Sequence, residues 1–186
     1  MPVILKTERL RFRELEDGDL DFVSSMLGDP AVMRFYPKTL TREESQAWID
    51  RQKKRYAEQG TGLWLALDKA SGRPVGQMGL VRQVVTGTPE DEIGYLLIPS
   101  CWGRGLATEG ACAIRDLAFE VLGREGVISL IRPENTPSQG VAERTGLSPR
   151  SRVQYAGFET IVFSLGREDF RARSASGLSG AKGDFS

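Results

Sequence analysis

The sequence of 186 residues contains no histidine. Histidine is the general base of Ser-His-Asp and Cys-His catalytic sites and a common zinc ligand, so its absence excludes these sites in their usual form. Two cysteines are present, Cys101 and Cys112, without a partner motif or the spacing of a metal site. Any proton transfer must therefore use carboxylates, hydroxyls, tyrosines, water or the substrate itself.

Net charge and long apolar runs are also lacking. The 25 Lys and Arg residues balance 25 Asp and Glu residues, so nothing overall favours a nucleic acid or an anionic membrane as partner. No stretch approaches the ~20 apolar residues needed to span a bilayer. Lys6, Glu8 and Arg9 precede any long apolar run, which argues against a signal peptide. We therefore expect a cytoplasmic protein without metal, nucleic-acid or membrane partners.

Hydrophobic periodicity and turn residues predict one mixed α/β domain over residues 1–167. Thr41 and Glu44 match a capping box at the start of a long polar helix. Residues 168–186 are rich in Gly and Ser and form a tail whose last part we expect to be disordered. The pattern predicts strands over 10–15, 62–68, 74–83, 90–98 and 126–131, helices over 20–27, 41–59, 107–123 and 136–146, and a closing hairpin over 152–165.

Two glycines lie between a predicted strand and a predicted helix, in the stretch WGRGLATEG over 102–110. The phosphate-loop pattern GxxxxGK[ST] is absent, and the dinucleotide pattern GxGxxG fails because Thr108 occupies its last position. Two interpretations remain. The loop either lets helix N-terminal amides bind a pyrophosphate, with Arg104 adding charge, or it is a tight packing turn.

Two motifs in order favour the first interpretation. The sequence WGRGLATEG after EIGYLLIP resembles the acyl-CoA pyrophosphate loop of the GNAT acetyltransferase superfamily, with Trp102 in its first position. The stretch PENTPSQGVAERTGL resembles a second motif of the branch that acetylates ribosomal-protein N-termini. Asn135, Ser138, Gly146 and Leu147 occupy its positions. The resemblance extends from residue 7 to about 165 and includes TERLRFRELEDGDLDFV and TREESQAWIDRQ.

The resemblance implies the GNAT fold, a mixed and mostly antiparallel sheet that splays near its middle, with helices on both faces. It implies acetyl-CoA as co-substrate, with pantetheine bound to strand backbone in the splay, and no metal. The residues implied to bind the cofactor are Tyr95, Leu96, Leu97, Gly103, Arg104, Gly105, Leu106, Ala107, Thr108 and Asn135. For Asn135, a turn-forming role beside two prolines is the alternative.

Three residues are implied to act in catalysis. The backbone N–H of Leu97 would stabilise the oxyanion, and Glu92 would be the base unless it is only a solvated strand-end carboxylate. Ser138 would protonate the CoA thiolate or else cap its helix. The tyrosine that many members carry seven residues after the asparagine is absent, since that position is Ala142.

The resemblance therefore predicts an N-acetyltransferase that acts by direct attack of a primary amine, from a protein N-terminus or a small molecule, in a ternary complex. The alternative is a non-catalytic acyl-CoA-binding or regulatory module. Family resemblance places the acceptor between the first two helices and the final hairpin. The basic run Arg51–Tyr56 indicates either a solvated helix face or contact with an acidic partner, and a homodimer is left open.

Overall fold

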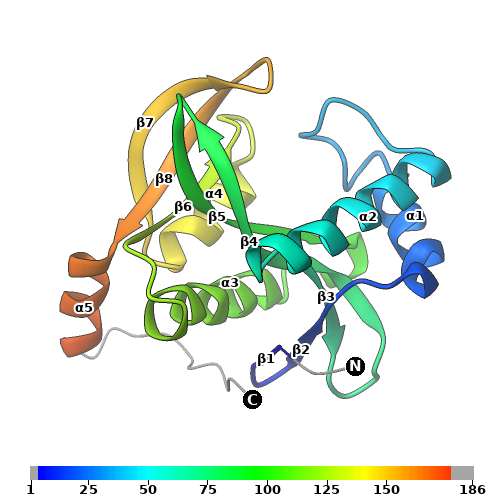
Figure 1. Cartoon of the computed structure of the whole chain (residues 1–186), viewed down its shortest axis with the longest axis horizontal. Coiled ribbons are helices and arrows are strands. Elements are labelled where there is room, and N and C mark those ends of the chain that lie inside the picture. Colours follow the sequence, from blue (N-terminus) through cyan, green and yellow to red (C-terminus); the bar gives the residue numbers. More distant parts are fainter. Residues whose placement is uncertain (1–3, 177–186) are drawn as a thin grey trace.

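The computed structural model describes residues 4–176 (Figure 1). The strands are β1 (Leu5–Lys6), β2 (Leu10–Arg13), β3 (Leu63–Asp68), β4 (Pro74–Val85), β5 (Thr88–Leu97), β6 (Gly126–Ile131), β7 (Ser148–Tyr155) and β8 (Phe158–Gly166). The α-helices are α1 (Leu20–Leu27), α2 (Arg42–Gln59), α3 (Leu106–Asp116), α4 (Thr136–Arg144) and α5 (Arg167–Ala175). A π-helical turn, Leu117–Val121, continues α3.

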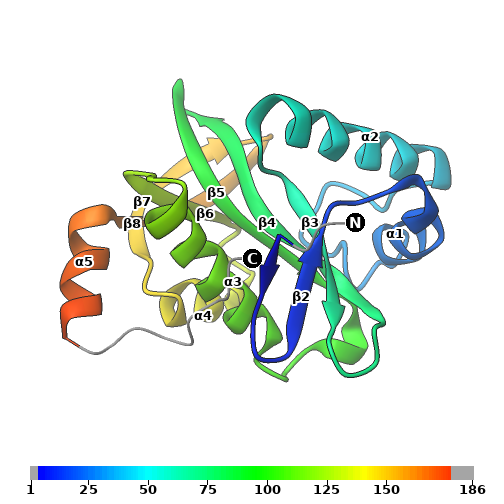
Figure 2. The same cartoon turned by 60° about the horizontal axis from the view of Figure 1, so that its bottom comes forward.

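The described strands form one sheet of eight in the order β1-β2-β3-β4-β5-β6-β8-β7. Neighbouring strands are antiparallel except β5 and β6, which are joined through α3 and run parallel. Helices α1 and α2 lie against one face and α3 and α4 against the other (Figure 2). The predicted mixed, mostly antiparallel sheet with helices on both faces is confirmed.

Alternation along β4 explains how both faces of the sheet are covered. Gln77 points to α2, where its Oε1 accepts a hydrogen bond from Trp48 Nε1 at 2.8 Å. The next residue, Met78, points to α3, where a Cβ added at Gly110 would lie 2.6 Å from its Sδ atom. Because successive strand residues face opposite sides, one strand anchors both helix layers. Glycine at position 110 permits the close approach of α3.

The predicted start of α2 is confirmed in detail. Thr41 Oγ1 accepts a hydrogen bond from the Glu44 backbone N–H at 3.2 Å, and Glu44 Oε2 accepts one from the Thr41 N–H at 2.9 Å. This reciprocal capping box satisfies two N–H groups at the helix start. The helix ends at Gly60, whose φ of 70° suits a glycine.

The sheet is split between β5 and β6. Only one residue pair of the two described strands, Glu92 and Ile128, is paired as in a sheet. By contrast, β5 pairs with β4 continuously from Thr88 to Leu97. The part of β5 beyond Glu92 therefore has a backbone partner on one side and faces a gap on the other, which confirms the expected splay.

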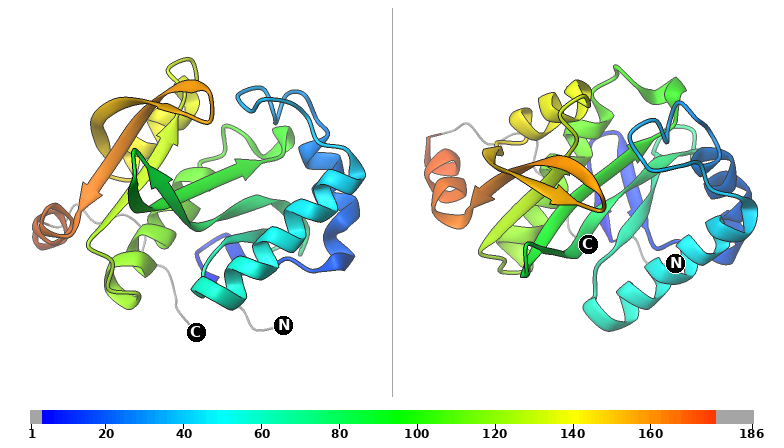
Figure 3. Two further views of the ribbon diagram at one scale, coloured as in Figure 1. Left: turned by 45° about the horizontal axis from the view of Figure 1, so that its top comes forward. Right: turned by 90° about the horizontal axis from the view of Figure 1, so that it is seen from above.

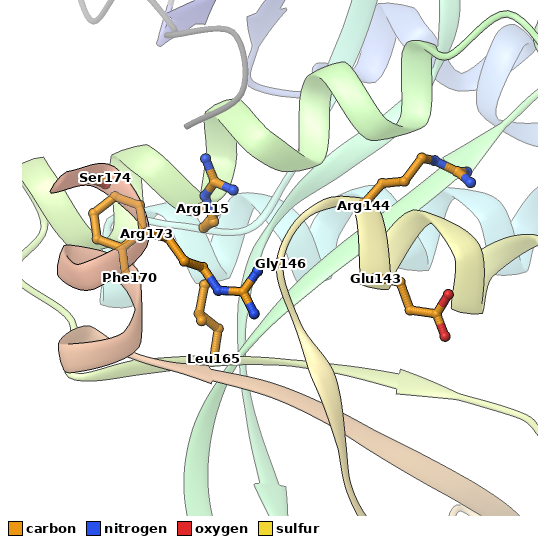
Figure 4. A pocket seen from close by; sticks show the side chains of 8 residues that line it. All are labelled: Arg115, Glu143, Arg144, Gly146, Leu165, Phe170, Arg173 and Ser174. Carbon is orange, nitrogen blue, oxygen red and sulfur yellow. The ribbon is translucent and has the colours of Figure 1, made fainter. Parts of the chain in front are cut away.

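Helix α5 was not predicted from the sequence, which places these residues in the tail. Its Phe170 is buried and stacks on Phe119 with ring centroids 4.5 Å apart. A small cavity of about 60 Å³ beside it is lined by side chains that include Arg115, Arg144 and Arg173 (Figure 4). The predicted disorder of the tail's last part falls on residues 177–186, which lie outside the described residues.

No helix within residues 4–176 is both long and apolar enough to cross a bilayer. No group of three or more His, Cys, Asp or Glu side chains in this range is arranged to hold a metal ion.

Candidate active site

A cavity of about 1120 Å³ opens at the split in the sheet. Its walls come from the α1–α2 loop, α2, β5, the starts of α3 and α4, and the β7–β8 hairpin. The α1–α2 loop and the hairpin tip stand on the same side of β5 (Figure 3). Eleven of the twelve residues expected at the site line this cavity: Glu92, Tyr95, Leu96, Leu97, Gly103, Gly105, Leu106, Ala107, Thr108, Asn135 and Ser138.

The exception is Arg104, whose side chain is exposed and is not part of the cavity wall. Its carbonyl oxygen accepts a hydrogen bond from Arg9 Nη1 at 2.8 Å. Arg104 thus helps to hold the loop through its backbone, and the structure does not bring its guanidinium into the cavity.

The glycine loop gives α3 an open N-terminus. Gly103 and Gly105 have φ values of 69° and 77°, in the left-handed region that side chains with a Cβ rarely adopt. Gly105 is the N-cap of α3, and no side chain caps the helix there. The first N–H groups of α3 therefore point into the cavity with the positive end of the helix dipole, an arrangement that binds anions.

The backbone of Leu97 faces the gap in the sheet. The N–H of Ile98 donates to Val75 of β4 at 3.0 Å, and N–H directions alternate along a strand, so the N–H and C=O of Leu97 point away from β4. The Leu97 carbonyl accepts a hydrogen bond from Trp102 Nε1 at 2.8 Å. Its N–H is left facing the cavity as a donor. Trp102 links the glycine loop to this end of β5, a role that the sequence did not reveal.

Glu92 is the half-buried carboxylate at the point where β5 and β6 separate. Burial raises its pKa, although a hydrogen bond from Gln83, backbone contact at Leu130 and the charge of Arg55 oppose the rise. Gln83 Nε2 donates to Glu92 Oε2 at 2.9 Å. A carboxylate with a raised pKa in a cavity is a better proton acceptor than a solvated one. The interpretation as a solvated strand-end group does not fit this position.

The N-terminus of α4 brings Asn135 and Ser138 to the opposite wall. Asn135 is the cap of this helix, because its Oδ1 accepts a hydrogen bond from the Ser138 N–H at 3.2 Å. The alternative of Ser138 as the cap is therefore wrong. The capping oxygen of Asn135 is used within the helix, which leaves its amide NH2 group as the part able to meet a ligand.

Tyr95 contributes a phenol as well as backbone. Its hydroxyl donates to the Ser138 carbonyl at 2.9 Å, so the side chain extends from β5 to α4. Burial and the nearby charge of Glu92 raise its pKa, and the hydroxyls of Ser129 and Ser138 act in the opposite direction. A neutral phenol thus lies beside Ser138. No sequence signal indicated this side-chain role, because Tyr95 was recognised through its strand alone.

Arg144 is a further cavity residue that the sequence did not single out. Its Nε donates to Thr108 Oγ1 at 3.2 Å, which places a guanidinium on α4 beside the first turn of α3. The proximity joins residues that lie 36 positions apart and depends on the fold. Arg144 provides positive charge at the open helix terminus, where Arg104 was expected to do so.

A split mixed sheet with an open helix terminus and a partly buried carboxylate beside the split is the arrangement expected from the sequence for an acyltransferase. The model of the acetyltransferase (GNAT) domain matches residues 9–148, more than half of the chain. The protein therefore belongs to the GNAT acetyltransferase family, whose members transfer an acetyl group from acetyl-CoA.

Individual proteins are similar to this chain over most of its length. The chain is 34% identical over 144 residues to the protein YkkB of Bacillus subtilis, covering 77% of this chain and 84% of that protein. An acetyltransferase structure from Agrobacterium tumefaciens has a TM-score of 0.76 at 28% identity, covering 89% of this chain and 94% of that one. RimL, a ribosomal L7/L12 α-N-protein acetyltransferase solved with coenzyme A, has a TM-score of 0.75 at 14% identity, covering 90% and 99%. This last likeness shows the fold alone.

Proposed function

We propose that the protein acetylates a primary amine by direct attack on acetyl-CoA held in the split of the sheet. The observation that carries the proposal is the single cavity into which Leu97 N–H, Glu92, the start of α3 and the start of α4 all face. The reaction requires a site that binds a pyrophosphate and exposes a thioester carbonyl, and in the proposal these elements do both within one cavity.

The binding of acetyl-CoA follows from the polar groups of the cavity. The open N–H groups of Leu106, Ala107 and Thr108 would bind the pyrophosphate, with Arg144 adding charge. The backbone groups of Tyr95 and Leu97, which point away from β4, would hydrogen-bond the pantetheine amides, and the arm then takes the place of a missing strand, while the backbone of Leu96 between them pairs with β4. Asn135 would donate from its amide to the same arm. These groups fit CoA because each is a hydrogen-bonding group that faces the gap.

The proposed chemistry is one nucleophilic substitution at the thioester carbon. The amine nitrogen forms the new C–N bond, the carbonyl oxygen becomes an oxyanion beside Leu97 N–H, and the C–S bond breaks. Glu92 takes a proton from the attacking amine, directly or through water, and Ser138 gives one to the departing thiolate. Because an α-amine has a pKa of about 8, a mild base is sufficient near neutral pH.

The kind of amine that accepts the acetyl group is the more specific part of the proposal. The resemblance of the stretches over 102–110 and 133–147 to the branch that acetylates ribosomal-protein N-termini supports a protein N-terminus, whereas the cavity between the α1–α2 loop and the hairpin is also suited to a small-molecule amine. One fold carries both activities, so the fold does not choose between them.

The test is thiol release from acetyl-CoA with a panel of amines and N-terminal peptides, with products identified by mass spectrometry. We expect CoA release that depends on the amine, and a matching acetylated product. The control without acceptor measures hydrolysis. Tight binding of acetyl-CoA with no amine-dependent release would favour the alternative, a non-catalytic binding module.

A further inference from the structure

The basic run on α2 separates into two groups in the fold. The lysines pair with acids outside the cavity, since Lys53 Nζ lies 2.9 Å from Asp17 Oδ2 and Lys54 Nζ lies 3.7 Å from Glu58 Oε1. The arginines of the same run, Arg51 and Arg55, line the large cavity instead. The sequence left open whether this run is a solvated face or meets an acidic partner, and the structure gives its two halves different surroundings.

A third arginine joins them from another element. Arg34, in the α1–α2 loop, lines the same cavity. Within residues 4–176, none of Arg34, Arg51 and Arg55 lies within ion-pair distance of an acidic side chain. Arg34 and Arg51 lie 5.4 and 5.3 Å from the ring centroids of Phe35 and Trp48.

The surroundings of Arg55 disfavour its charged form. Burial lowers its pKa, and the charge of Arg51, one helical turn away, lowers it further, while Glu92 acts in the opposite direction. Like charges four residues apart on a helix repel each other. An anion bound between Arg51 and Arg55 would remove this repulsion and supply the acceptor oxygens that guanidinium groups are shaped to bind.

Other walls of the cavity are aromatic. Tyr36 from the α1–α2 loop, Trp48 from α2, and Tyr155 and Phe158 from the hairpin all line it. Arg132 lies over the Phe158 ring at 3.3 Å from its centroid and adds another positive charge to the wall. The acidic groups on the cavity wall are Glu92, which the reaction uses, and Glu134. A polycationic acceptor would meet net repulsion here.

We propose that the amine acceptor is a small molecule that also carries a carboxylate or phosphate. Arg34, Arg51 and Arg55 bind that anionic group, the aromatic wall contacts the apolar part, and the amine lies at Glu92. Because both ends must lie in one cavity, the acceptor is compact. This inference rests on the proposed amine acetylation and names the substrate class for the same site.

The test uses matched pairs of amines that differ in one anionic group. Phenylalanine is compared with phenylalaninamide and phenethylamine, O-phosphoethanolamine with ethanolamine, and spermidine serves as the polycation. Thiol release is followed over a pH series, and kcat/KM is expressed for the unprotonated amine so that amine basicity does not bias the comparison. The two pairs distinguish a carboxylate from a phosphate. We expect the anionic member to react at least about tenfold faster, the effect of one charge-assisted hydrogen bond.

Two variants test whether the preference for anionic amines comes from the cavity arginines, and a third variant is the control. Arg55→Gln and Arg51→Gln should each lower the anionic-to-neutral preference several-fold. Arg73→Gln, an exposed arginine in the β3–β4 turn, should leave that preference unchanged. Melting temperatures confirm that each variant is folded. Titration of the CoA-bound protein with N-acetylphenylalanine and its amide gives the same comparison without turnover.

The outcomes separate this inference from the proposed function. Faster reaction of the neutral amines or of spermidine, or an anionic preference that survives both cavity variants, would overturn the inference while leaving amine acetylation in place. Faster reaction of an acidic N-terminal peptide than of any small anionic amine would overturn the small-molecule class. Absence of acetyl transfer to every amine would overturn the proposed function and the inference with it.

Discussion

Arg9 and Glu109 form an ion pair across the fold, with Arg9 Nε 2.6 Å from Glu109 Oε2. The Arg9 backbone N–H donates to Glu109 Oε1 at 2.8 Å, and Thr7 donates to the same oxygen. Since Glu109 lies in the first turn of α3 and Arg9 also binds the Arg104 carbonyl, the turn between β1 and β2 holds both sides of the glycine loop. A surface turn near the N-terminus thereby shapes the end of the cavity at the start of α3.

Glu109→Gln should weaken CoA binding without unfolding the protein at neutral pH. Burial acts to raise the Glu109 pKa, but hydrogen bonds from Thr7 and Arg9 outweigh it and lower the pKa. A lowered carboxyl pKa stabilises the fold above the unfolded-state pKa, and that stability is lost as pH falls through the folded-state pKa. Urea unfolding between about pH 3 and 6 should show this loss in the native chain and less of it in Glu109→Gln.

The matched control is Glu58→Gln on the outer face of α2, which should change neither calorimetric CoA affinity nor the pH profile of stability. Equal effects of the two substitutions would contradict the role given to Glu109.

Gly105→Asp and Gly105→Asn test the open helix terminus as a pair. Both side chains tolerate the left-handed backbone better than other residues and can cap a helix, so both variants should fold. A carboxylate at this position would repel a pyrophosphate, whereas the amide is neutral. We expect calorimetry to show loss of CoA binding in Gly105→Asp and a much smaller decrease in Gly105→Asn. Equal affinities in the two folded variants would refute the pyrophosphate site.

Glu92→Gln should lower kcat strongly at neutral pH while acetyl-CoA affinity stays nearly constant. The loss should shrink as pH rises and the amine loses its proton without help. An equal loss at every pH would assign Glu92 to acceptor positioning instead. Measurement of kcat and of acetyl-CoA affinity over a pH series distinguishes the two roles.

Stability provides an independent check on the same residue. Burial raises the Glu92 pKa, so the fold favours the protonated form, and the stability this provides is lost as pH rises through the folded-state pKa. The free energy of unfolding of Glu92→Gln should therefore increase relative to the native chain between acidic and neutral pH. A constant difference would mean that Glu92 is not desolvated.

Asn135→Ala and Ser138→Ala should separate helix capping from proton donation. Asn135→Ala removes the α4 cap and should cost roughly 0.5–2 kcal/mol of unfolding free energy. Ser138→Ala should lower kcat and barely move the melting temperature. Tyr95→Phe is the comparison, because its hydroxyl lies beside Ser138. A larger loss of kcat in Tyr95→Phe than in Ser138→Ala would transfer the acid role to the phenol.

Phe170→Ala should destabilise the protein although it lies beyond residue 167, where we expected the domain to end. Its ring stacks on Phe119 and is buried, so truncation should cost roughly 3 kcal/mol by the usual range for core aromatics. Urea unfolding measures the loss. Arg171→Ala, an exposed neighbour on α5, is the control. Unchanged stability of Phe170→Ala would support the earlier boundary.

Local chemistry explains what could be predicted from the sequence. The capping box at Thr41 and the glycine pair at 103 and 105 act within a few residues, so their sequence patterns predicted the structure directly. The resemblance to the GNAT family predicted the splay at β5. The sequence left open whether Ser138 is the α4 cap or an acid, and it did not indicate Asn135 as the cap, because the two residues are equally good cap formers and only the backbone geometry decides between them.

Long-range contacts explain what could not be predicted. Helix α5 has a short, polar sequence, and its stability depends on packing against Phe119, 51 residues before Phe170 in the chain. Arg144 meets Thr108, and Arg34 lines the same cavity as the arginines of α2, only through tertiary structure. Nothing in the sequence near these arginines distinguishes a cavity residue from a solvated one.

The single residue pair between β5 and β6 has a consequence for how the molecule unfolds. Strands β1 to β5 form one run of consecutive antiparallel neighbours, and β6 to β8 form another, so hydrogen bonding is dense within each half and sparse between them. Cooperativity between the halves is then carried mainly by side-chain packing in the core that they share. A ligand that bridges the split would add backbone bonds to both sides and make two weakly coupled folding units behave more nearly as one.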